Sequence, residues 1–244
     1  MKSKIFNVIN QIRLSRSKKN SLSDLGPLYH NYSFFGINNI QIKGIFEENQ
    51  KAKQSIILAY IAYAIAKTKE MTSDEISFTE LFCADGFYAM VARRLGCDLS
   101  IGIDNNREGF MEKSQTIAKR IGLDNVNFIK SDITAASKFK MTDIVANIGG
   151  LYHVSDPEDI LMMSYLMTKR YLIIQSVVSL ATNDENYFSS PAPGWTWGNR
   201  FSKASFDKMI QRRGFKVIDK HFNKLTGNDR LEDKGSVYYL IEKQ

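Results

Sequence analysis

Acidic, tyrosine and histidine side chains at three places in the sequence have the chemistry of a ligand site. Asp104 lies in the run GIDNN and Asp132 in KSDI, and each follows a short apolar stretch. A carboxylate only accepts hydrogen bonds, so at such a position it suits the hydroxyl groups or an amine of a ligand. Tyr152 and His153 lie in NIGGLYH. An imidazole with an ordinary pKa of about 6.5 can take a proton from an attacking hydroxyl or amine.

Alternating helical and strand-like patterns from residue 51 onward predict how these side chains are positioned. Helical patterns at 51–69, 88–95, 108–121, 157–167 and 205–213 alternate with apolar, strand-like runs at 76–83, 99–104, 126–130, 142–147 and 171–178. Buried strands separated by helices indicate a doubly wound α/β sheet, in which ligands bind at the carboxyl ends of the strands. Asp104, Asp132 and the NIGGLYH loop each follow such an end.

The last part of the chain departs from this alternation. Residues 214–219 and 236–242 read as two strands with only a polar segment between them. Neighbouring strands joined without a crossover helix pair antiparallel. A mostly parallel sheet with an antiparallel last strand disfavours an ordinary dinucleotide-binding dehydrogenase.

The run ELFCADGFY, after the first predicted strand, occupies the place of a cofactor loop. Ala84 is small enough for close approach of a ligand, and Gly86 permits an unusual backbone angle. The run does not match G-x-G-x-x-G, so we do not expect it to bind a pyrophosphate. Taken singly, Asp104 and Asp132 also fit the role of a helix N-cap or a turn residue.

The order ELFCADGFY, GIDNN, KSDI and NIGGLYH resembles motifs I to IV of the class I S-adenosylmethionine-dependent methyltransferases, over about residues 50–244. The resemblance implies a Rossmann-like methyltransferase sheet and S-adenosylmethionine as the cofactor. It assigns the ribose to Asp104, and adenine to Asp132 with Ile133 against the ring. The implied cofactor residues are Glu80, Phe82, Cys83, Ala84, Gly86, Asp104, Asn105, Asp132, Ile133 and Asn147.

The first loop departs from the family's acid-x-Gly-x-Gly-x-Gly pattern. Phe82 and Ala84 stand where the first two glycines fall, and only Gly86 matches. S-adenosylmethionine has no phosphate, so a loop with fewer glycines is compatible with it.

Residues for the acceptor are expected on two segments. Tyr152 and His153 follow the fourth strand and are the candidates for catalysis and substrate contact, unless they only fill the pocket wall. An insertion around residues 183–204 carries Trp195, Trp197 and Arg200. We expect it to form a substrate lid; the alternative is a rigid loop whose aromatic side chains pack inward.

A narrower resemblance is to the branch that contains the tRNA wobble-uridine carboxymethyltransferase. GGLYHVSDP and the long insertion after the fifth strand look similar to that enzyme. The resemblance implies that Tyr152, and Arg230 near the carboxyl end, hold the carboxylate of a carboxymethyl donor. Arg230 lies among Asp229, Glu232 and Asp233, so a surface ion pair is the alternative role.

Composition limits the remaining possibilities. Two cysteines and three scattered histidines predict neither a disulfide framework nor a metal site. The apolar run 56–66 is too short to span a bilayer, and no signal-peptide core is evident, so we expect a cytoplasmic protein. The formal net charge is +7, and the first twenty residues hold basic but no acidic side chains. We therefore expect a basic extension over residues 1–50, with a short amphipathic helix at its start, packing on a methyltransferase domain of residues 51–244.

These patterns predict an enzyme that transfers a methyl group to an oxygen or nitrogen of a small polar molecule, such as a sugar. The alternatives are a tRNA-modifying methyl- or carboxymethyltransferase and a non-catalytic cofactor-binding subunit. The basic amino terminus favours tRNA, and the altered glycine loop permits the subunit. The sequence leaves the acceptor and the oligomeric state open.

Overall fold

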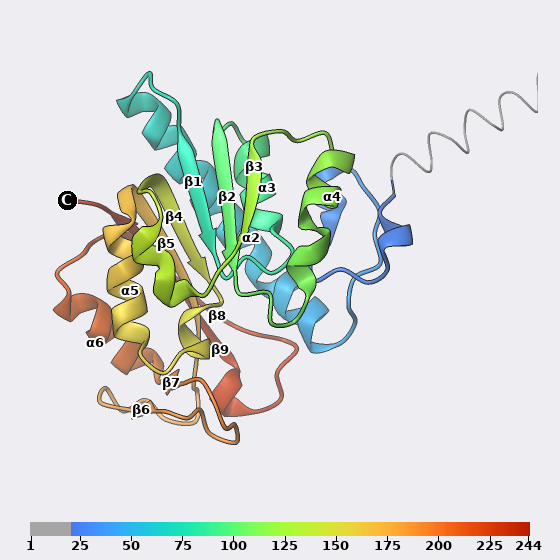
Figure 1. Ribbon diagram of the computed structural model, residues 1–244. Coiled ribbons are helices and arrows are strands. Elements are labelled where there is room, and N and C mark those ends of the chain that lie inside the picture. The colour runs from blue at the N-terminus through green and yellow to red at the C-terminus, as the bar shows by residue number, and fades with distance from the viewer. Residues whose placement is uncertain (1–20) are drawn as a thin grey trace, which may run out of the picture.

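A seven-stranded sheet forms the centre of the protein (Figure 1). The computed structural model describes residues 21–244, without the side chains of 136–138. The strand order is β3-β2-β1-β4-β5-β9-β8. The strands are β1 (Ser77–Leu81), β2 (Leu99–Asp104), β3 (Val126–Lys130), β4 (Thr142–Ile148), β5 (Thr168–Val178), β8 (Lys216–Lys224) and β9 (Gly235–Glu242).

The direction of the strands agrees with the prediction. β1 to β5 pair in parallel, whereas β9 runs antiparallel to both of its neighbours, β5 and β8. The doubly wound, mostly parallel sheet with an antiparallel last strand is therefore confirmed. The strand order reverses between β1 and β4, where a ligand is expected in such a sheet.

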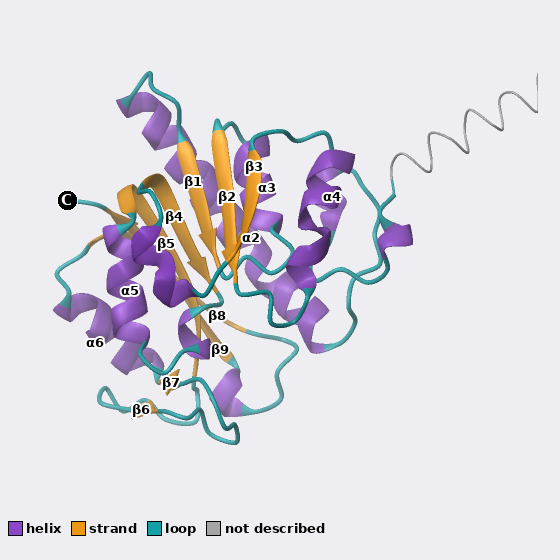
Figure 2. Cartoon of the chain, in the orientation of Figure 1, coloured by secondary structure: helices purple, strands orange, loops and turns teal. Residues whose placement is uncertain are grey.

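Helices cover both faces of the sheet (Figure 2). Side chains from α2 (Ile45–Met71), α3 (Phe87–Arg94) and α4 (Ser114–Arg120) join one hydrophobic cluster, and those from α5 (Pro157–Leu166) and α6 (Lys203–Arg212) join the other. β4 supplies both clusters in alternation: Ile144 and Ala146 point to the first, and Val145 to the second. This two-residue alternation is that of a strand buried on both faces.

Two helices differ from their predicted bounds by more than two residues. α2 begins at Ile45, six residues before the predicted start, because Gly44 precedes it with a φ of 83°. The predicted helix over residues 108–121 is divided into a 3-10 turn at Phe110–Lys113 and α4, after Gly109 at a φ of 74°. Within the insertion, β6 (Phe188–Ser189) and β7 (Arg200–Phe201) form a separate two-stranded sheet.

Residues 21–44 pack on the face that carries α2 and α3. Leu22, Leu28 and Tyr32 are buried in the first hydrophobic cluster. The His30 backbone N–H donates to Asp85 Oδ2 at 2.9 Å, and His30 Nδ1 lies 2.5 Å from Asp85 Oδ1. The amino-terminal segment is thus joined to the loop after β1. The basic helix expected within the first twenty residues lies outside the described residues, and the boundary at residue 51 stays a prediction.

Three further properties concern the described residues alone. None of the helices within residues 21–244 is both long and apolar enough to cross a membrane. The same part of the chain contains no group of three or more metal-ligating side chains in range of one ion. Cys83 and Cys97 are both buried thiols without a disulfide.

Candidate active site

A cavity of about 630 Å³ lies at the carboxyl ends of β1, β2 and β4. Its walls come from the loops that follow these strands, from the loop after β3, from α2, and from residues 29–30. Ten of the residues predicted from the sequence line it: Glu80, Phe82, Ala84, Asp104, Asn105, Asp132, Ile133, Tyr152, His153 and Trp197.

The loop after β1 keeps the backbone of a glycine loop although it contains one glycine. Phe82, Ala84 and Gly86 have φ angles of 59°, 48° and 77°. This left-handed conformation costs a residue with a side chain roughly 1–2 kcal/mol. At Gly86 there is, in addition, no room for a side chain, because a Cβ there would lie 2.1 Å from the Phe128 ring. The backbone is therefore left-handed at all three positions, although two of them carry a side chain.

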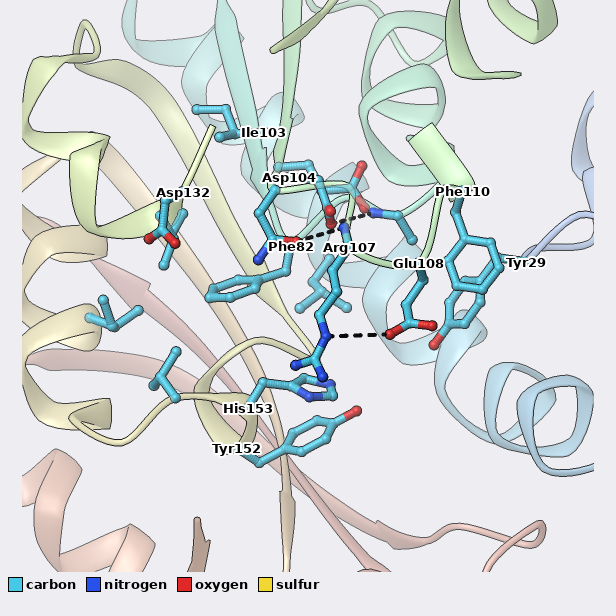
Figure 3. A pocket seen from close by; sticks show the side chains of 18 of the residues that line it. Tyr29, Phe82, Ile103, Asp104, Arg107, Glu108, Phe110, Asp132, Tyr152 and His153 are labelled. Carbon is cyan, nitrogen blue, oxygen red and sulfur yellow. Dashed lines mark hydrogen bonds and ion pairs between the residues drawn. The ribbon is translucent and has the colours of Figure 1, made fainter. Parts of the chain in front are cut away.

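Phe82 links this loop to the loop after β4. A Cβ on Gly150 would lie 1.9 Å from the Phe82 ring, so the ring packs directly on that glycine. Figure 3 shows the Phe82 ring pointing into the cavity between Asp132 and His153. The side chain that replaces the first glycine consequently forms part of the cavity wall.

The part of the cavity near β1 and β2 is rich in carboxyl groups. Glu80 is 2% exposed and accepts the Ala89 N–H at 2.7 Å. Burial, with Asp85 and Asp104 nearby, raises its pKa well above the ordinary value. Burial likewise raises the pKa of Asp104, against two backbone N–H groups that lower it. Because a cation favours the charged form of a carboxyl group, a positively charged ligand suits this end.

Asp104 and Asp132 differ in their hydrogen bonds. Asp104 Oδ2 accepts the Ala84 N–H at 3.1 Å and Oδ1 accepts the Asn106 N–H at 2.6 Å, so the carboxylate ties two loops together. Asp132 is exposed, and its Oδ1 accepts from the backbone and hydroxyl of Thr134. These bonds lower its pKa. Asp132 therefore has the turn role considered above, and its other carboxylate oxygen accepts no hydrogen bond from the side chains that the structure describes.

The opposite part of the cavity is aromatic. The rings of Tyr152 and His153 have centroids 4.1 Å apart, and Trp197 stacks on His153 at 5.1 Å with an interplanar angle of 11°. Figure 3 shows the Arg107 side chain reaching from the loop after β2 toward His153. The His153 side chain is exposed at the cavity wall, and its ring packs against those of Tyr152 and Trp197. Partial desolvation, followed by the cations Arg200, Lys53 and Arg107, lowers its pKa to about 4.

The insertion is fastened to the loop after β4 by Asn199. Its Nδ2 donates to Leu151 O at 2.7 Å and to Val154 O at 2.6 Å, and its backbone N–H donates to Tyr152 O at 3.0 Å. Gly198 permits this approach, because a Cβ there would lie 2.5 Å from Tyr152 O. The contact places Trp197 against His153.

Arg200 packs behind the aromatic part of the cavity. It is 3% exposed, and its Nε and Nη2 donate to Asp233 Oδ1 at 2.8 and 2.6 Å. Its guanidinium carbon lies 5.2 Å from the centroid of the Tyr152 ring. Arg200 thus orients Tyr152 without lining the cavity.

Five other predicted residues do not line the cavity either. Cys83, Gly86 and Asn147 are buried behind the wall, and the Asn147 amide donates to Ser164 Oγ at 3.0 Å. Trp195 is 44% exposed beside Trp197. Arg230 donates to the backbone oxygen of Pro193 and lies 3.6 Å from Asp233. These contacts of Arg230 agree with its alternative role, a surface ion pair.

Several lining residues were not predicted. They come from the amino-terminal segment, from one face of α2, and from the loop after β2: Tyr29, His30, Phe46, Gln50, Lys53, Arg107, Glu108 and Phe110. Phe46, Gln50 and Lys53 recur at the spacing of one helical face. Gln50 and Lys53 are polar side chains on the buried face of a helix, and this was the feature of the sequence that could have indicated a cavity there.

The family of the chain follows from its sequence. The methyltransferase domain family matches residues 72–214, which is more than half of the chain. The chain belongs to this family and has the class I S-adenosylmethionine-dependent methyltransferase fold. No curated protein has a matching sequence.

Solved structures have the same fold at low sequence identity. Magnesium protoporphyrin IX methyltransferase from Synechocystis PCC 6803, with bound S-adenosylhomocysteine, is 14% identical, with a TM-score of 0.62; the match covers 88% of this chain and 97% of that one. The N-terminal domain of EvdMO1, with bound S-adenosylhomocysteine, is 15% identical, with a TM-score of 0.61, and the match covers 96% and 97%. A second structure of that domain was obtained with S-adenosylhomocysteine and D-fucose; it is 16% identical over 96% and 97% of the chains, with a TM-score of 0.60.

Proposed function

We propose that the protein transfers a methyl group from S-adenosylmethionine to an oxygen or nitrogen of a small polar molecule. The observation that carries the proposal is the division of one cavity into a carboxyl-rich part, at Glu80 and Asp104, and an aromatic part, at Tyr152, His153 and Trp197. A volume of about 630 Å³ falls within the usual size of a small-molecule site.

The chain's own residues have distinct roles in this proposal. Asp104 accepts hydrogen bonds from the ribose hydroxyls and Asp132 from the adenine amine. When bound, the cofactor supplies a methyl group that is already activated by a sulfonium. The carboxyl of Glu80 favours that positive charge, and the Phe82 ring covers the cofactor beside Gly150. Tyr152, His153 and Trp197 exclude water and align the acceptor, which can supply much of the acceleration.

His153 is the residue proposed to accept the acceptor's proton. Its pKa of about 4 leaves the imidazole neutral near pH 7, so a ring nitrogen can accept a proton. The low pKa also makes it a weak base, and alignment therefore contributes more than proton transfer.

The choice of a small acceptor draws on two similar structures. One is that of a methyltransferase for magnesium protoporphyrin IX, and another was obtained with D-fucose. At 14–16% identity these proteins share the fold, so they support a class of acceptor and not an individual one.

The alternative is a tRNA-modifying methyl- or carboxymethyltransferase. It draws on the net charge of +7 and on the basic first twenty residues. Arg230 gives it no support, because that side chain contacts Pro193 and the acidic residues next to it instead of lining the cavity.

A methyl-labelling experiment distinguishes the two proposals, because each predicts that a different class of molecule receives the label. The protein would be incubated with methyl-labelled S-adenosylmethionine and either the small-molecule fraction of a cell extract or total tRNA. We expect label in a small molecule and its loss with Asp104→Ala. Label in tRNA alone, with salt-sensitive binding, would replace the small-molecule proposal by the alternative.

A further inference from the structure

Lys53 is a buried basic side chain in the wall of the cavity. It is 4% exposed, on the face of α2 that also carries Phe46 and Gln50. Among the side chains that the structure describes, its ammonium group has no hydrogen-bond or ion-pair partner, and burial alone acts on it. A buried charge is ordinarily paired, because desolvation without a partner is unfavourable.

Three carboxyl groups in or behind the cavity wall are paired with other basic side chains. Asp85 is joined to His30, Asp233 to Arg200, and Glu108 to Arg107 at the cavity mouth, with a nitrogen to oxygen distance of 3.9 Å. No carboxyl group is close enough to act on Lys53, whose pKa is lowered to about 8 by burial alone. Near pH 7 the ammonium group is therefore mostly charged and has no counter-charge.

Lys53 acts on the acceptor part of the cavity. It is one of three cations, with Arg200 and Arg107, that lower the pKa of His153, and no carboxyl group opposes them there. Arg200 is neutralised by Asp233, and Arg107 is exposed, so Lys53 is the buried cation left without a counter-charge. Gln50, one helical turn away, has a buried Oε1 without a hydrogen-bond partner. The helix thus offers a charged donor and an amide to a ligand in the cavity.

We propose that Lys53 binds an anionic group of the acceptor, a carboxylate or a phosphate, so that the substrate is an acid and not a neutral sugar. The inference rests on the proposed methyl transfer and narrows its substrate class. It also accounts for the distribution of charge, because the cofactor's sulfonium lies with Glu80 in the carboxyl-rich part and the acceptor's anion with Lys53. A charge-assisted hydrogen bond from a buried ammonium is among the stronger polar contacts in proteins.

The test uses glycolate and inorganic phosphate as probes, with methyl glycolate as the neutral counterpart of glycolate. Each is titrated into the full-length protein saturated with S-adenosylhomocysteine, and binding is followed by NMR. We expect saturable binding of at least one anion and none of methyl glycolate. Lys53→Gln should weaken anion binding about ten-fold or more, the size of one hydrogen bond to a charged group. Lys51→Gln is the matched control, because Lys51 lies exposed on the same helix with Glu47 and Glu48.

Two results would overturn the inference: the absence of anion binding to the wild-type complex, and anion binding that Lys53→Gln leaves unchanged. If the wild-type complex binds no anion and Lys53→Gln also loses affinity for S-adenosylhomocysteine, Lys53 holds the cofactor's own carboxylate instead. If wild-type protein does not bind S-adenosylhomocysteine, the proposed function itself fails, and titration of glycolate into the free protein still reports on Lys53.

If Lys53→Gln does not fold, the proton uptake of the wild-type protein on binding glycolate tests the inference instead. An anion beside Lys53 raises its pKa from about 8, so glycolate binding near pH 8 should take up protons. Calorimetry in two buffers of different ionisation enthalpy measures this uptake. Binding without proton uptake would contradict the inference.

Discussion

The cofactor part and the acceptor part of the cavity are built in different ways. The first comes from loops directly after β1, β2 and β3, held by short contacts such as that from Ala84 N–H to Asp104. The second brings together Lys53 on α2, Tyr152 after β4, and Trp197 in the insertion, with Asp233 behind them. One part depends on the backbone of neighbouring strands and the other on side chains from distant segments. Substitutions should therefore affect the two parts separately.

The largest expected effect is that of Gly86→Ala in the cofactor part. The new Cβ would meet Phe128 at 2.1 Å, at a φ of 77°. Backbone strain and overpacking together should lower the free energy of unfolding by roughly 2–5 kcal/mol and weaken cofactor binding. Urea denaturation measures the first effect.

Gly122→Ala is the matched control for that substitution. Gly122 has a φ of 72° but no atom within 4 Å of an added Cβ. Only the strain of about 1–2 kcal/mol should remain there. Equal losses for the two variants would mean that contact with Phe128 does not restrict the loop.

Trp197→Ala should have a smaller effect, confined to the acceptor part. Loss of the ring stacked on His153 should reduce the rate of methyl transfer about ten-fold, because the acceptor is then less well aligned. Affinity for S-adenosylhomocysteine should stay within about two-fold, since no contact to the cofactor loops is removed. Trp195→Ala, at an exposed ring outside the cavity wall, is the control and should retain the wild-type rate. A cofactor affinity that falls with Trp197→Ala would show that the two parts are coupled.

The smallest effect concerns His153 and acid stability. Its pKa is lowered from 6.5 to about 4 in the folded protein, so between these values the unfolded chain binds a proton that the folded chain does not. Stability should therefore decrease as pH falls from 6.5 toward 4. His153→Gln should make this decrease shallower when denaturation is measured across the range. Equal slopes for the wild type and His153→Gln would refute the shift.

The comparison also explains how much could be predicted from the sequence. The bounds of β2 and β3 were correct to the residue, and the residues that follow β1, β2 and β3 were expected at one edge. This succeeded because the carboxyl ends of parallel strands meet at one edge of the sheet whatever the side chains are. The left-handed backbone at Phe82 and Ala84 was not predictable from residue types that disfavour it.

The acceptor part was less accessible to prediction. Arg200 reads as a substrate residue until Asp233, 33 positions away, is seen to accept hydrogen bonds from its Nε and Nη2. Lys53 lies in a helix whose apolar pattern predicts a buried face; a polar side chain on that face is a local signal, but it does not indicate that the ammonium group meets a cavity. Contacts between distant segments decide both roles, and periodicity and motif spacing do not carry that information.

Binding of S-adenosylhomocysteine to wild-type protein and to Asp104→Ala, measured by calorimetry, tests the central claim most directly. We expect one site per chain in the wild type, no competition from NAD, and a loss of about ten-fold or more in Asp104→Ala, because hydrogen bonds to a charged group are removed. The folded state of the variant is checked by its circular dichroism spectrum. Binding of NAD alone, or equal affinity of the two proteins for S-adenosylhomocysteine, would contradict the assignment of the cofactor to the loops after β1 and β2.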